Sequence, residues 1–493
     1  GCPYYWNEPL FGYYRDTDEY VLRKHAELLA DAGVDVIIFD CTNGTETWDE
    51  SCEKLFEVFT SAKADGVNVP QVAFMLPFND SADTTTSLKN LYERIYSKGR
   101  YSDLWFMWDN KPLIMAHSSG LNRLDAAERE ILRFFTFREN DPGYFSKGTR
   151  YGEKKWGWCS VSPQAAYGKS LNGRIEQMCV SVAQNAADGE LTAMNAEADV
   201  QGRGYAEGDY SYSYESAGKT VTVTAETENA MLYGLNFQQQ WDNALAADPD
   251  FIFVTGWNEW IAGRWEEWQG TLNAFPDQFS DAFSRDIEPA AGILKDHFYY
   301  QLTANIRRFK GISAETEANG GEKTYYHYKN SPRRRDADGW QGLHYNADTM
   351  RNDFVKATVR DDGAYIYMQI FTENEISPRT DDAWMRVWID TDESGLSPNW
   401  EGFEYVINRH SAGERTVRVE KSLGGWEFAE TGAAEYTVEG NVMTLKIPAA
   451  ALGLTDAIRF RFKLSDNMQT DGDIMDFYRS GDVAPGGRFT FVY

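Results

Sequence analysis

The stretch that decides the fold is Phe251-Ile-Phe-Val-Thr-Gly-Trp-Asn-Glu-Trp260, an apolar run that ends abruptly in an amide, a carboxylate and two tryptophans. A continuous apolar run of this length is typical of a strand buried on both faces, the usual case in a parallel sheet covered by helices. Barrel enzymes carry their chemistry at the C-terminal ends of such strands. Glu259 is therefore the first candidate for a catalytic residue.

Outward from this stretch, helical and strand-like segments alternate through residues 1–311. The segments with helical periodicity are 18–32, 48–64, 84–98, 125–139, 234–247 and 287–309. The strand-like segments are 34–40, 70–76, 104–108, 111–116, 155–161 and 177–183, followed by the run before Glu259. Repeated strand–helix units predict an α/β fold, and their number favours a closed (β/α)8 TIM-like barrel over a doubly wound sheet.

Two features depart from a regular barrel. No conventional first strand precedes helix 18–32, so either the chain was cut inside the domain or the barrel opens irregularly within residues 2–14. Residues 202–231 are rich in Gly and Tyr and then alternate as Lys219-Thr-Val-Thr-Val-Thr224. This alternation predicts a β-hairpin insertion near 202–231 at a loop close to the active face.

After Gly311 the pattern changes to short strands separated by Gly, Asp, Asn and Pro turns. Such spacing predicts a second domain over 312–493, an antiparallel β-sandwich. The acidic, Gly-rich segment 314–322 is the expected linker or first loop.

Composition limits the ligands and partners. The formal net charge of −28 argues against nucleic acid or an anionic membrane surface and favours a neutral or cationic ligand. No apolar run is long enough to span a bilayer. Sixteen tryptophans suit a surface that stacks on sugar rings, so we expect a carbohydrate substrate. We also expect a monomeric protein. The five cysteines are odd in number and lack a CxxC pattern, which predicts no disulfide framework and leaves one bridge open.

The segment Thr255-Gly-Trp-Asn-Glu-Trp260 resembles the N-E-W segment of family 99 glycoside hydrolases and the related WbsX-like glycan proteins. The resemblance implies a (β/α)8 barrel and a glycoside hydrolase; the family includes endo-α-mannosidases and mannanases. The family segment runs N-E-x-x-E, and both glutamates act on the sugar. Asn258 and Glu259 match it, whereas Ala262 stands at the position of the second Glu.

Residues 312–493 resemble family 9 carbohydrate-binding modules, through Arg386-Val-Trp-Ile-Asp-Thr-Asp392 and the segment from Trp400 to Val406. The resemblance implies a sugar-binding module, for which Trp384, Trp388, Trp400 and Trp426 are the candidate platform, although strand alternation makes two of these ordinary core residues. A structural Ca²⁺ could be held by Asp390 and Asp392 with Glu401 or Glu404. No other cofactor and no catalytic metal are expected, because the six histidines form no metal-binding pattern.

Glycoside hydrolysis needs a proton donor and a second carboxylate. Apolar indole walls suit Glu259 for the donor, because they raise the pKa of a carboxyl group. Asp40, at the end of strand 34–40, is one candidate for the second carboxylate, and Glu266 or Glu267 in the following loop is the other. The candidates for contact with the substrate are Trp257, Asn258, Trp260, Asn43, Arg264, Trp265 and Asp109.

The sequence thus predicts a glycoside hydrolase acting on a complex glycan or polysaccharide, with a secreted or cell-surface location inferred from acidity and resemblance. The alternative is a non-catalytic glycan-binding protein whose barrel site has degenerated, and Ala262 is the feature that keeps it open.

Overall fold

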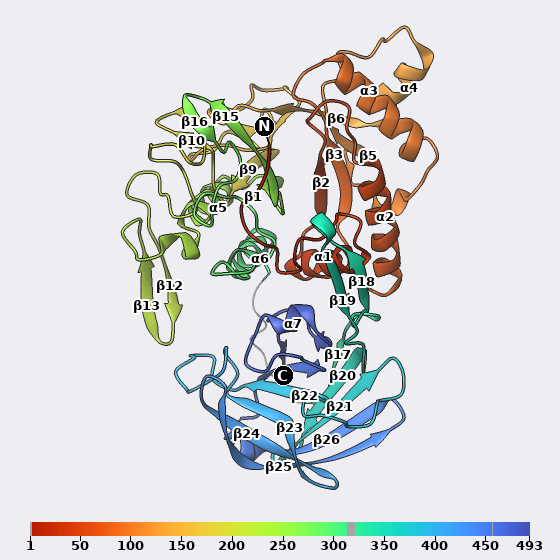
Figure 1. Cartoon of the computed structure of the whole chain (residues 1–493), viewed down its shortest axis with the longest axis vertical. Helices are drawn as coiled ribbons and strands as arrows, with labels where there is room; N and C mark the ends of the chain where they lie inside the picture. Colours follow the sequence, from red (N-terminus) through yellow and green to blue (C-terminus); the bar gives the residue numbers. More distant parts are fainter. Residues whose placement is uncertain (1, 313–320, 456) are drawn as a thin grey trace.

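The computed structural model describes residues 2–312, 321–455 and 457–493. It consists of a mixed α/β part that includes both the N-terminus and Glu259, and of an antiparallel part that ends the chain (Figure 1). Among the helices of the described ranges, none combines the length and the apolarity that a bilayer span requires.

Among the described residues, the α/β part contains six α-helices, and a seventh lies near the C-terminus. They are α1 Glu19–Ala32, α2 Asp49–Ala64, α3 Ala82–Leu91, α4 Ala126–Phe134, α5 Leu235–Ala247, α6 His297–Lys310 and α7 Asp476–Arg479. The strands of the α/β part are β1 Cys2–Tyr5, β2 Val36–Asp40, β3 Gln71–Met75, β4 Met107–Trp108, β5 Lys111–Met115, β6 Thr136–Asp141, β7 Lys155–Gly157, β8 Ala166–Tyr167, β9 Gln177–Ser181, β10 Ala186–Ala187, β11 Glu190–Leu191, β12 Tyr212–Ser216, β13 Lys219–Val223, β14 Phe251–Thr255, β15 Ile261–Trp268 and β16 Thr271–Ala274.

The parallel strands form two sheets that share one core. β2, β3, β5, β6 and β7 are joined in that order, and β9 pairs in parallel with β14. Residues from both sheets, such as Met75, Met115, Phe251 and Phe253, pack into a single buried cluster. In addition, the Gln177 amide at the start of β9 bonds the backbone N–H and C=O of Gly157 in β7. In the described ranges no backbone ladder joins the two sheets, so a parallel α/β fold is observed and the closed eight-fold barrel stays a prediction.

The helices cover the outer face of the larger sheet. Successive residues of a strand point to opposite sides of the sheet, so every second side chain faces these helices. Phe74 and Ile114 face outward and pack with Phe56 and Phe59 of α2. The helix bounds follow local chemistry: the Asp18 carboxylate caps the first turn of α1, and Gly33 ends α1 with a left-handed φ of 79°.

Two predicted helices need correction, and the start of the chain is irregular. Helix 125–139 ends at Phe134, and Thr136–Asp141 is instead a parallel strand, β6, which pairs with β5. Helix 287–309 begins only at His297, because Pro289 and Gly292 interrupt a helical backbone. The first strand, β1, pairs antiparallel with β15, so the N-terminus lies against the strand that follows Glu259. The predicted excursion near 202–231 contains the exposed β12–β13 hairpin.

The antiparallel part is one nearly closed sheet, where two packed sheets were predicted. Its strands are β17 Lys323–Tyr326, β20 Phe354–Asp361, β21 Tyr365–Thr372, β22 Arg386–Asp390, β23 Tyr405–Gly413, β24 Thr416–Gly424, β25 Glu427–Glu439, β26 Val442–Pro448, β27 Arg461–Asp466, β28 Asp482–Ala484 and β29 Phe491–Val492, beside a separate hairpin of β18 Arg335–Asp338 and β19 His344–Ala347. Register shifts interrupt the ladders of β20, β23, β24 and β25, and such bulges bend long strands around a common core. The predicted linker, 314–322, lies mostly outside the described residues.

The two parts share buried contacts. One hydrophobic cluster contains Tyr20 and Tyr299 of the α/β part together with Trp388, Trp400 and Phe477 of the antiparallel part. Trp388 and Trp400 are 0% and 3% exposed, so they pack as core and not as a sugar platform.

The β18–β19 hairpin, next to α1 in Figure 1, adds a buried ion pair. Arg335 donates from Nε and Nη2 to the Asp18 carboxylate at 2.9 and 2.8 Å, and from Nη1 to the Phe11 carbonyl at 2.8 Å. The two parts are therefore expected to stabilise each other.

We predict that Arg335→Gln lowers the free energy of unfolding by about 3 kcal/mol, because it leaves the buried Asp18 carboxylate without its charged partner. The measurement is thermal unfolding of the full chain. Arg334→Gln is the matched control, since its neighbouring guanidinium is 57% exposed and its loss should cost less than about 0.5 kcal/mol. Equal midpoints for the two variants would contradict the role given to the buried pair.

Candidate functional site

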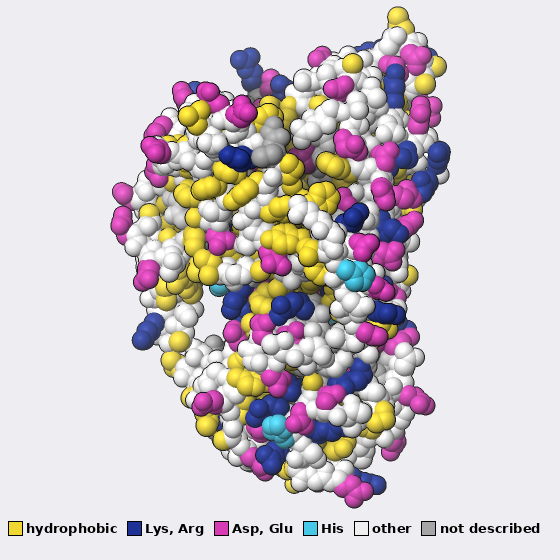
Figure 2. Space-filling model, in the orientation of Figure 1, with side chains coloured by type: hydrophobic (Ala, Val, Ile, Leu, Met, Phe, Trp, Pro, Cys, Tyr) yellow, Lys and Arg dark blue, Asp and Glu magenta, His cyan; other side chains and the backbone are white. Residues whose placement is uncertain are grey.

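Three strand ends meet around Glu259. It follows the end of β14, where the Thr255 hydroxyl donates to the carbonyl of Trp158, just after β7. The negative charge of Asp40, the last residue of β2, acts on the Glu259 carboxyl group. The C-terminal ends of strands from both parallel sheets therefore converge here, and we call this edge the mouth. On the face shown in Figure 2, hydrophobic side chains gather over the middle of the α/β part, and acidic side chains are spread along its edges.

The Glu259 side chain is 46% exposed and lies beside a buried arginine. Arg285 Nη2 is 3.9 Å from Glu259 Oε2 and 2.6 Å from Asp277 Oδ1. The two carboxylate oxygens are therefore no farther apart than the sum of these distances. Gln278 makes a long contact to Glu259 Oε2, at 3.5 Å. The structure thus brings together an accessible carboxyl group, a second carboxylate and a guanidinium group.

The surroundings raise the pKa of Glu259 to about 8. Desolvation by the protein is the main cause, and the negative charge of Asp277 adds to it, while Arg285 acts in the opposite direction. A carboxyl group of this kind is largely protonated at neutral pH and can donate a proton.

Arg285 is held from several sides. Its Nη1 donates to the Asn185 Oδ1 at 3.2 Å and to the Tyr144 hydroxyl at 3.4 Å, and its guanidinium lies 5.8 Å from the Trp158 ring centre. The side chain is 4% exposed. The positive charge beside Glu259 is therefore fixed in place.

A buried carboxylate, Glu288, positions the two residues that flank Glu259. Its Oε2 accepts from Asn258 Nδ2 and Trp260 Nε1, both at 2.7 Å, and from the Tyr14 hydroxyl at 2.6 Å. His25 Nε2 is 2.9 Å from its other oxygen. Burial alone would raise the pKa of Glu288, but His25 and these donors hold it below the ordinary value. These hydrogen bonds therefore fix the side chains of Asn258 and Trp260.

Asp286 is a further buried carboxylate beneath Glu259. It accepts from Trp6 Nε1 at 2.8 Å and from Gln278 Nε2 at 3.2 Å. Burial raises its pKa to about 6, although the hydrogen bonds partly offset this rise.

One exposed indole lies at the mouth, and a second lies farther along β15. Trp48 is 44% exposed, and its Nε1 donates to the backbone carbonyl of Asp40 at 2.7 Å. It has a φ of 50°, which is uncommon for a bulky residue and is found more often at functional sites. Trp265, on β15, is 49% exposed.

The other predicted residues lie in the loop after β2 and along β15. Asn43 is exposed in the loop after β2. Arg264, Glu266 and Glu267 lie on β15, and Arg264 donates to Asn273 at 2.6 Å. Because an extended strand rises about 3.3 Å per residue, Glu266 lies roughly 16 Å along β15 from Ile261. The structure therefore carries Glu266 and Glu267 away from Glu259.

Asp109 does not belong to the mouth. It lies in the β4–β5 turn, before β5 begins, and Arg138 Nη2 donates to it at 2.9 Å. The beginning of a parallel strand lies at the opposite edge from the C-terminal ends that carry Asp40 and Glu259. We therefore leave Asp109 out of the candidate site.

The predicted calcium site stays a prediction. Burial and the nearby Asp390 raise the pKa of Glu404 to about 7, whereas Asp392 accepts from Ser394 and Ser397 within its own turn. Among the residues that the structure describes, no group of three or more His, Cys, Asp or Glu is arranged to hold a metal ion. Cys41, Cys52, Cys159 and Cys179 are free and buried.

Sequence reasoning missed the residues of segment 277–288. Asp277, Arg285, Asp286 and Glu288 all lie in the irregular stretch between β16 and α6. The predicted helix 287–309 overlaps this segment only at Ile287 and Glu288, although the run Ile287-Glu-Pro-Ala-Ala-Gly292 contains the Pro and the Gly that argue against a helix. The segment contains five charged residues, Asp277, Asp281, Arg285, Asp286 and Glu288, and none of them was among the predicted candidates.

No family model matches the chain, and no curated protein matches it. Among solved structures, it is similar to the GH99 endo-α-mannosidase from Bacteroides thetaiotaomicron in complex with BIS-TRIS-propane, with 14% identity, 62% of this chain and 89% of that chain covered, and a TM-score of 0.37. A second structure of a GH99 endo-α-mannosidase from the same organism gives 12% identity, 62% and 84% coverage and a TM-score of 0.33.

We predict that Glu288→Gln lowers the free energy of unfolding by about 2–3 kcal/mol, because an amide cannot accept all the hydrogen bonds that the buried carboxylate accepts. Thermal unfolding measures the loss, and Trp fluorescence should report a changed environment of Trp260. The control is Glu266→Gln on exposed β15, which should remain within about 0.5 kcal/mol of the parent. A Glu288→Gln variant as stable as this control would contradict the anchoring role.

Proposed function

We propose that the protein is a glycoside hydrolase whose proton donor is Glu259 and whose second carboxylate is Asp277. The observation that carries the proposal is the accessible Glu259 carboxyl group paired with Asp277 across one buried guanidinium group. The proposal includes a (β/α)8 barrel as the scaffold, because the two parallel sheets share one core.

In the proposed reaction, the glycosidic oxygen takes the proton of Glu259 as the bond to the anomeric carbon breaks. Asp277 then either attacks that carbon or activates a water molecule. Retaining enzymes hold their two carboxyl groups about 5–5.5 Å apart, and inverting enzymes about 6.5–9.5 Å apart. The contacts of 3.9 and 2.6 Å to the shared Arg285 Nη2 bring Glu259 and Asp277 close enough for either arrangement, and the anomeric configuration of the product distinguishes the two.

Arg285 positions Asp277, whereas Asp40 has a weaker claim. The Asp40 Oδ1 accepts from the Thr42 backbone N–H at 2.9 Å, in a local turn. The Asp277 carboxylate, in contrast, accepts a charge-assisted hydrogen bond at 2.6 Å from the buried Arg285 guanidinium, and such bonds are stronger than neutral ones. Asp40 then acts on Glu259 through its charge and supports Trp48 through its carbonyl.

The aromatic groups suit a sugar ligand. Indole faces stack on the apolar faces of sugar rings, and the amide of Asn258 lies next to the proton donor. We propose Trp48 and Trp265 as stacking residues, and a glycan or polysaccharide as substrate. A sugar-binding role of the antiparallel part and a secreted or cell-surface location remain parts of the proposal.

We predict that Glu259→Gln reduces kcat by about 10²- to 10⁴-fold, because the amide has no proton to give to the leaving oxygen. The fold should remain intact, as judged by circular dichroism. Product release from a panel of α- and β-linked glycans measures the activity. Glu267→Gln serves as the control and should keep the parent rate; a Glu259→Gln rate within threefold of the parent would refute the assignment.

The same donor gives the sign of the pH dependence. Because the pKa of Glu259 is about 8, the proton is present below pH 8, and kcat/KM should fall as the pH rises through that value. In Asp277→Asn the alkaline limb should move to lower pH, because the negative charge that helps to raise the pKa of Glu259 is gone.

We further predict that Asp277→Asn costs as much activity as Glu259→Gln, and that the double variant is little worse than either, since residues that act as one unit are not additive. Asp40→Asn should be milder. A severe Asp40→Asn defect with a mild Asp277→Asn defect would exchange the two roles.

A glycan-binding protein without catalysis is the second candidate. Ala262, at the position of the second Glu in family 99, is 5% exposed and pairs with Tyr4 of β1. This position therefore faces the protein and offers no carboxylate. Glycan binding without product release in the parent protein would favour this candidate.

A further inference from the structure

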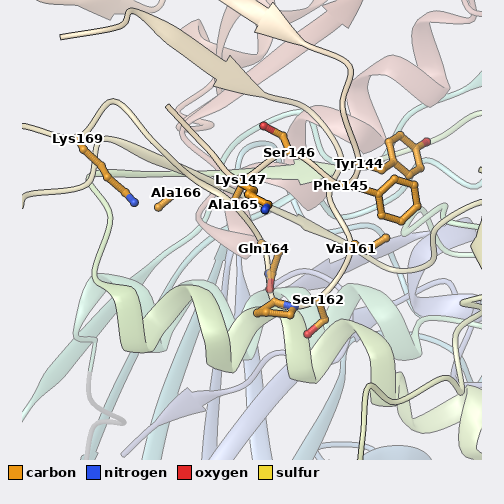
Figure 3. Close-up of a pocket in the computed structure, with 11 residues that line it drawn as sticks. Tyr144, Phe145, Ser146, Lys147, Val161, Ser162, Gln164, Ala165, Ala166 and Lys169 are labelled. Atoms are coloured by element: carbon orange, nitrogen blue, oxygen red, sulfur yellow. The ribbon is translucent and has the colours of Figure 1, made fainter. Parts of the chain in front are cut away.

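A cavity of about 410 Å³ lies next to the mouth (Figure 3). It is lined by the segment after β6, by the loop that leads into β8 and by Lys169 after β8. This volume is within the range of small-ligand sites, roughly 300–1,000 Å³. None of the catalytic candidates lines it.

One wall of the cavity is rigid. Gln164 is 8% exposed, and its Nε2 donates to the carbonyls of Cys179 in β9 at 3.1 Å and of Gln240 in α5 at 2.7 Å. Its Oε1 accepts from Asn243 Nδ2 at 3.1 Å, and Asn243 also donates to Ser162 Oγ at 2.9 Å. Because a sheet and a helix hold these side chains, the cavity is preformed.

The charge of the cavity is opposite to that of the protein. Its lining contains Lys147 and Lys169 and no acidic residue, although the chain has 76 Asp and Glu. Within the described ranges, neither lysine forms an ion pair, so both ammonium groups are available to an anion. Phe145, 38% exposed, adds a ring face to the same cavity.

Tyr144 connects the cavity with the catalytic candidates. It lines the cavity, while its hydroxyl accepts from Arg285 Nη1 at 3.4 Å. In Figure 3 this hydroxyl points away from the side chains of Lys147 and Lys169. Tyr144 therefore contacts both the cavity and the arginine beside the catalytic candidates.

We propose that this cavity is a subsite for an anionic sugar unit, a uronate or a sulfate ester, held by Lys147 and Lys169 with its ring against Phe145. The inference rests on the proposed function and names the class of its substrate: an acidic glycan. The negative net charge predicted a neutral or cationic ligand. An anionic sugar unit differs from that prediction, because the acidic protein presents a local cationic site to it.

Binding of monosaccharides to the full chain tests the subsite without turnover. Glucuronic acid and glucose 6-sulfate are the two anionic probes, and glucose is the neutral one, each titrated by NMR into the parent, Lys147→Gln, Lys169→Gln and the double variant. We expect at least one anionic probe to bind more tightly than glucose, and the double variant to lose about tenfold in that affinity. Salt should weaken binding of the anion and leave glucose unaffected.

Lys98→Gln is the charge-matched control, because Lys98 is exposed after α3 and remote from the cavity lining. Its affinities should equal those of the parent, and thermal unfolding should be unchanged in all the lysine variants. Preference for the uronate or for the sulfate ester identifies the anionic group. Anion affinities that are equal in the parent and the double variant, or no tighter than those of glucose, would overturn the inference.

The same titrations in Glu259→Gln, together with the hydrolysis assay of the parent, separate the two proposals. Anion binding that depends on the lysines, together with no hydrolysis by the parent, would leave the subsite intact and refute the hydrolase. Hydrolysis without such binding would leave the hydrolase intact and refute the subsite. On an acidic oligosaccharide that the parent cleaves, the double lysine variant should raise KM about tenfold with kcat unchanged, since the lysines bind and do not react.

Discussion

The mouth depends on one buried positive charge. Arg285 is almost fully enclosed, and a buried guanidinium requires anionic partners and hydrogen-bond acceptors to offset its desolvation. Asp277 supplies the charge at 2.6 Å, and Asn185 and Tyr144 supply acceptors. Glu259 remains 3.9 Å from the guanidinium, too far for a tight ion pair. The arginine therefore fixes Asp277 and leaves Glu259 with a raised pKa.

Segment 277–288 combines support and chemistry. Asp277 is partly exposed at the mouth, whereas Asp286 and Glu288 lie beneath it and accept hydrogen bonds from Trp6 and Trp260. An irregular loop rarely holds catalytic groups with precision unless packed side chains restrain it. Here the buried carboxylates Asp286 and Glu288 accept hydrogen bonds from the indoles of Trp6 and Trp260, and these bonds restrain the loop.

The antiparallel part contributes to the stability of the whole chain. Its tryptophans Trp388 and Trp400 are buried against residues of the α/β part, and Arg335 neutralises the carboxylate that also caps α1. An accessory module joined by a flexible linker would lack such contacts. A surface that binds glycan on this part would therefore have to use side chains other than these two.

The sequence by itself determined the parallel α/β character of the first part and the antiparallel second part, and it selected Glu259 as a candidate, because hydrophobic periodicity and an abrupt end of an apolar run are local signals. It did not determine that 136–141 is a strand, since only pairing with β5 overrides the helical pattern there. Nor did it connect Glu259 with Asp277 and Arg285, or Asn258 with Glu288. Those contacts join residues whose relation depends on how loops fold back over the sheets, and only the tertiary structure decides that.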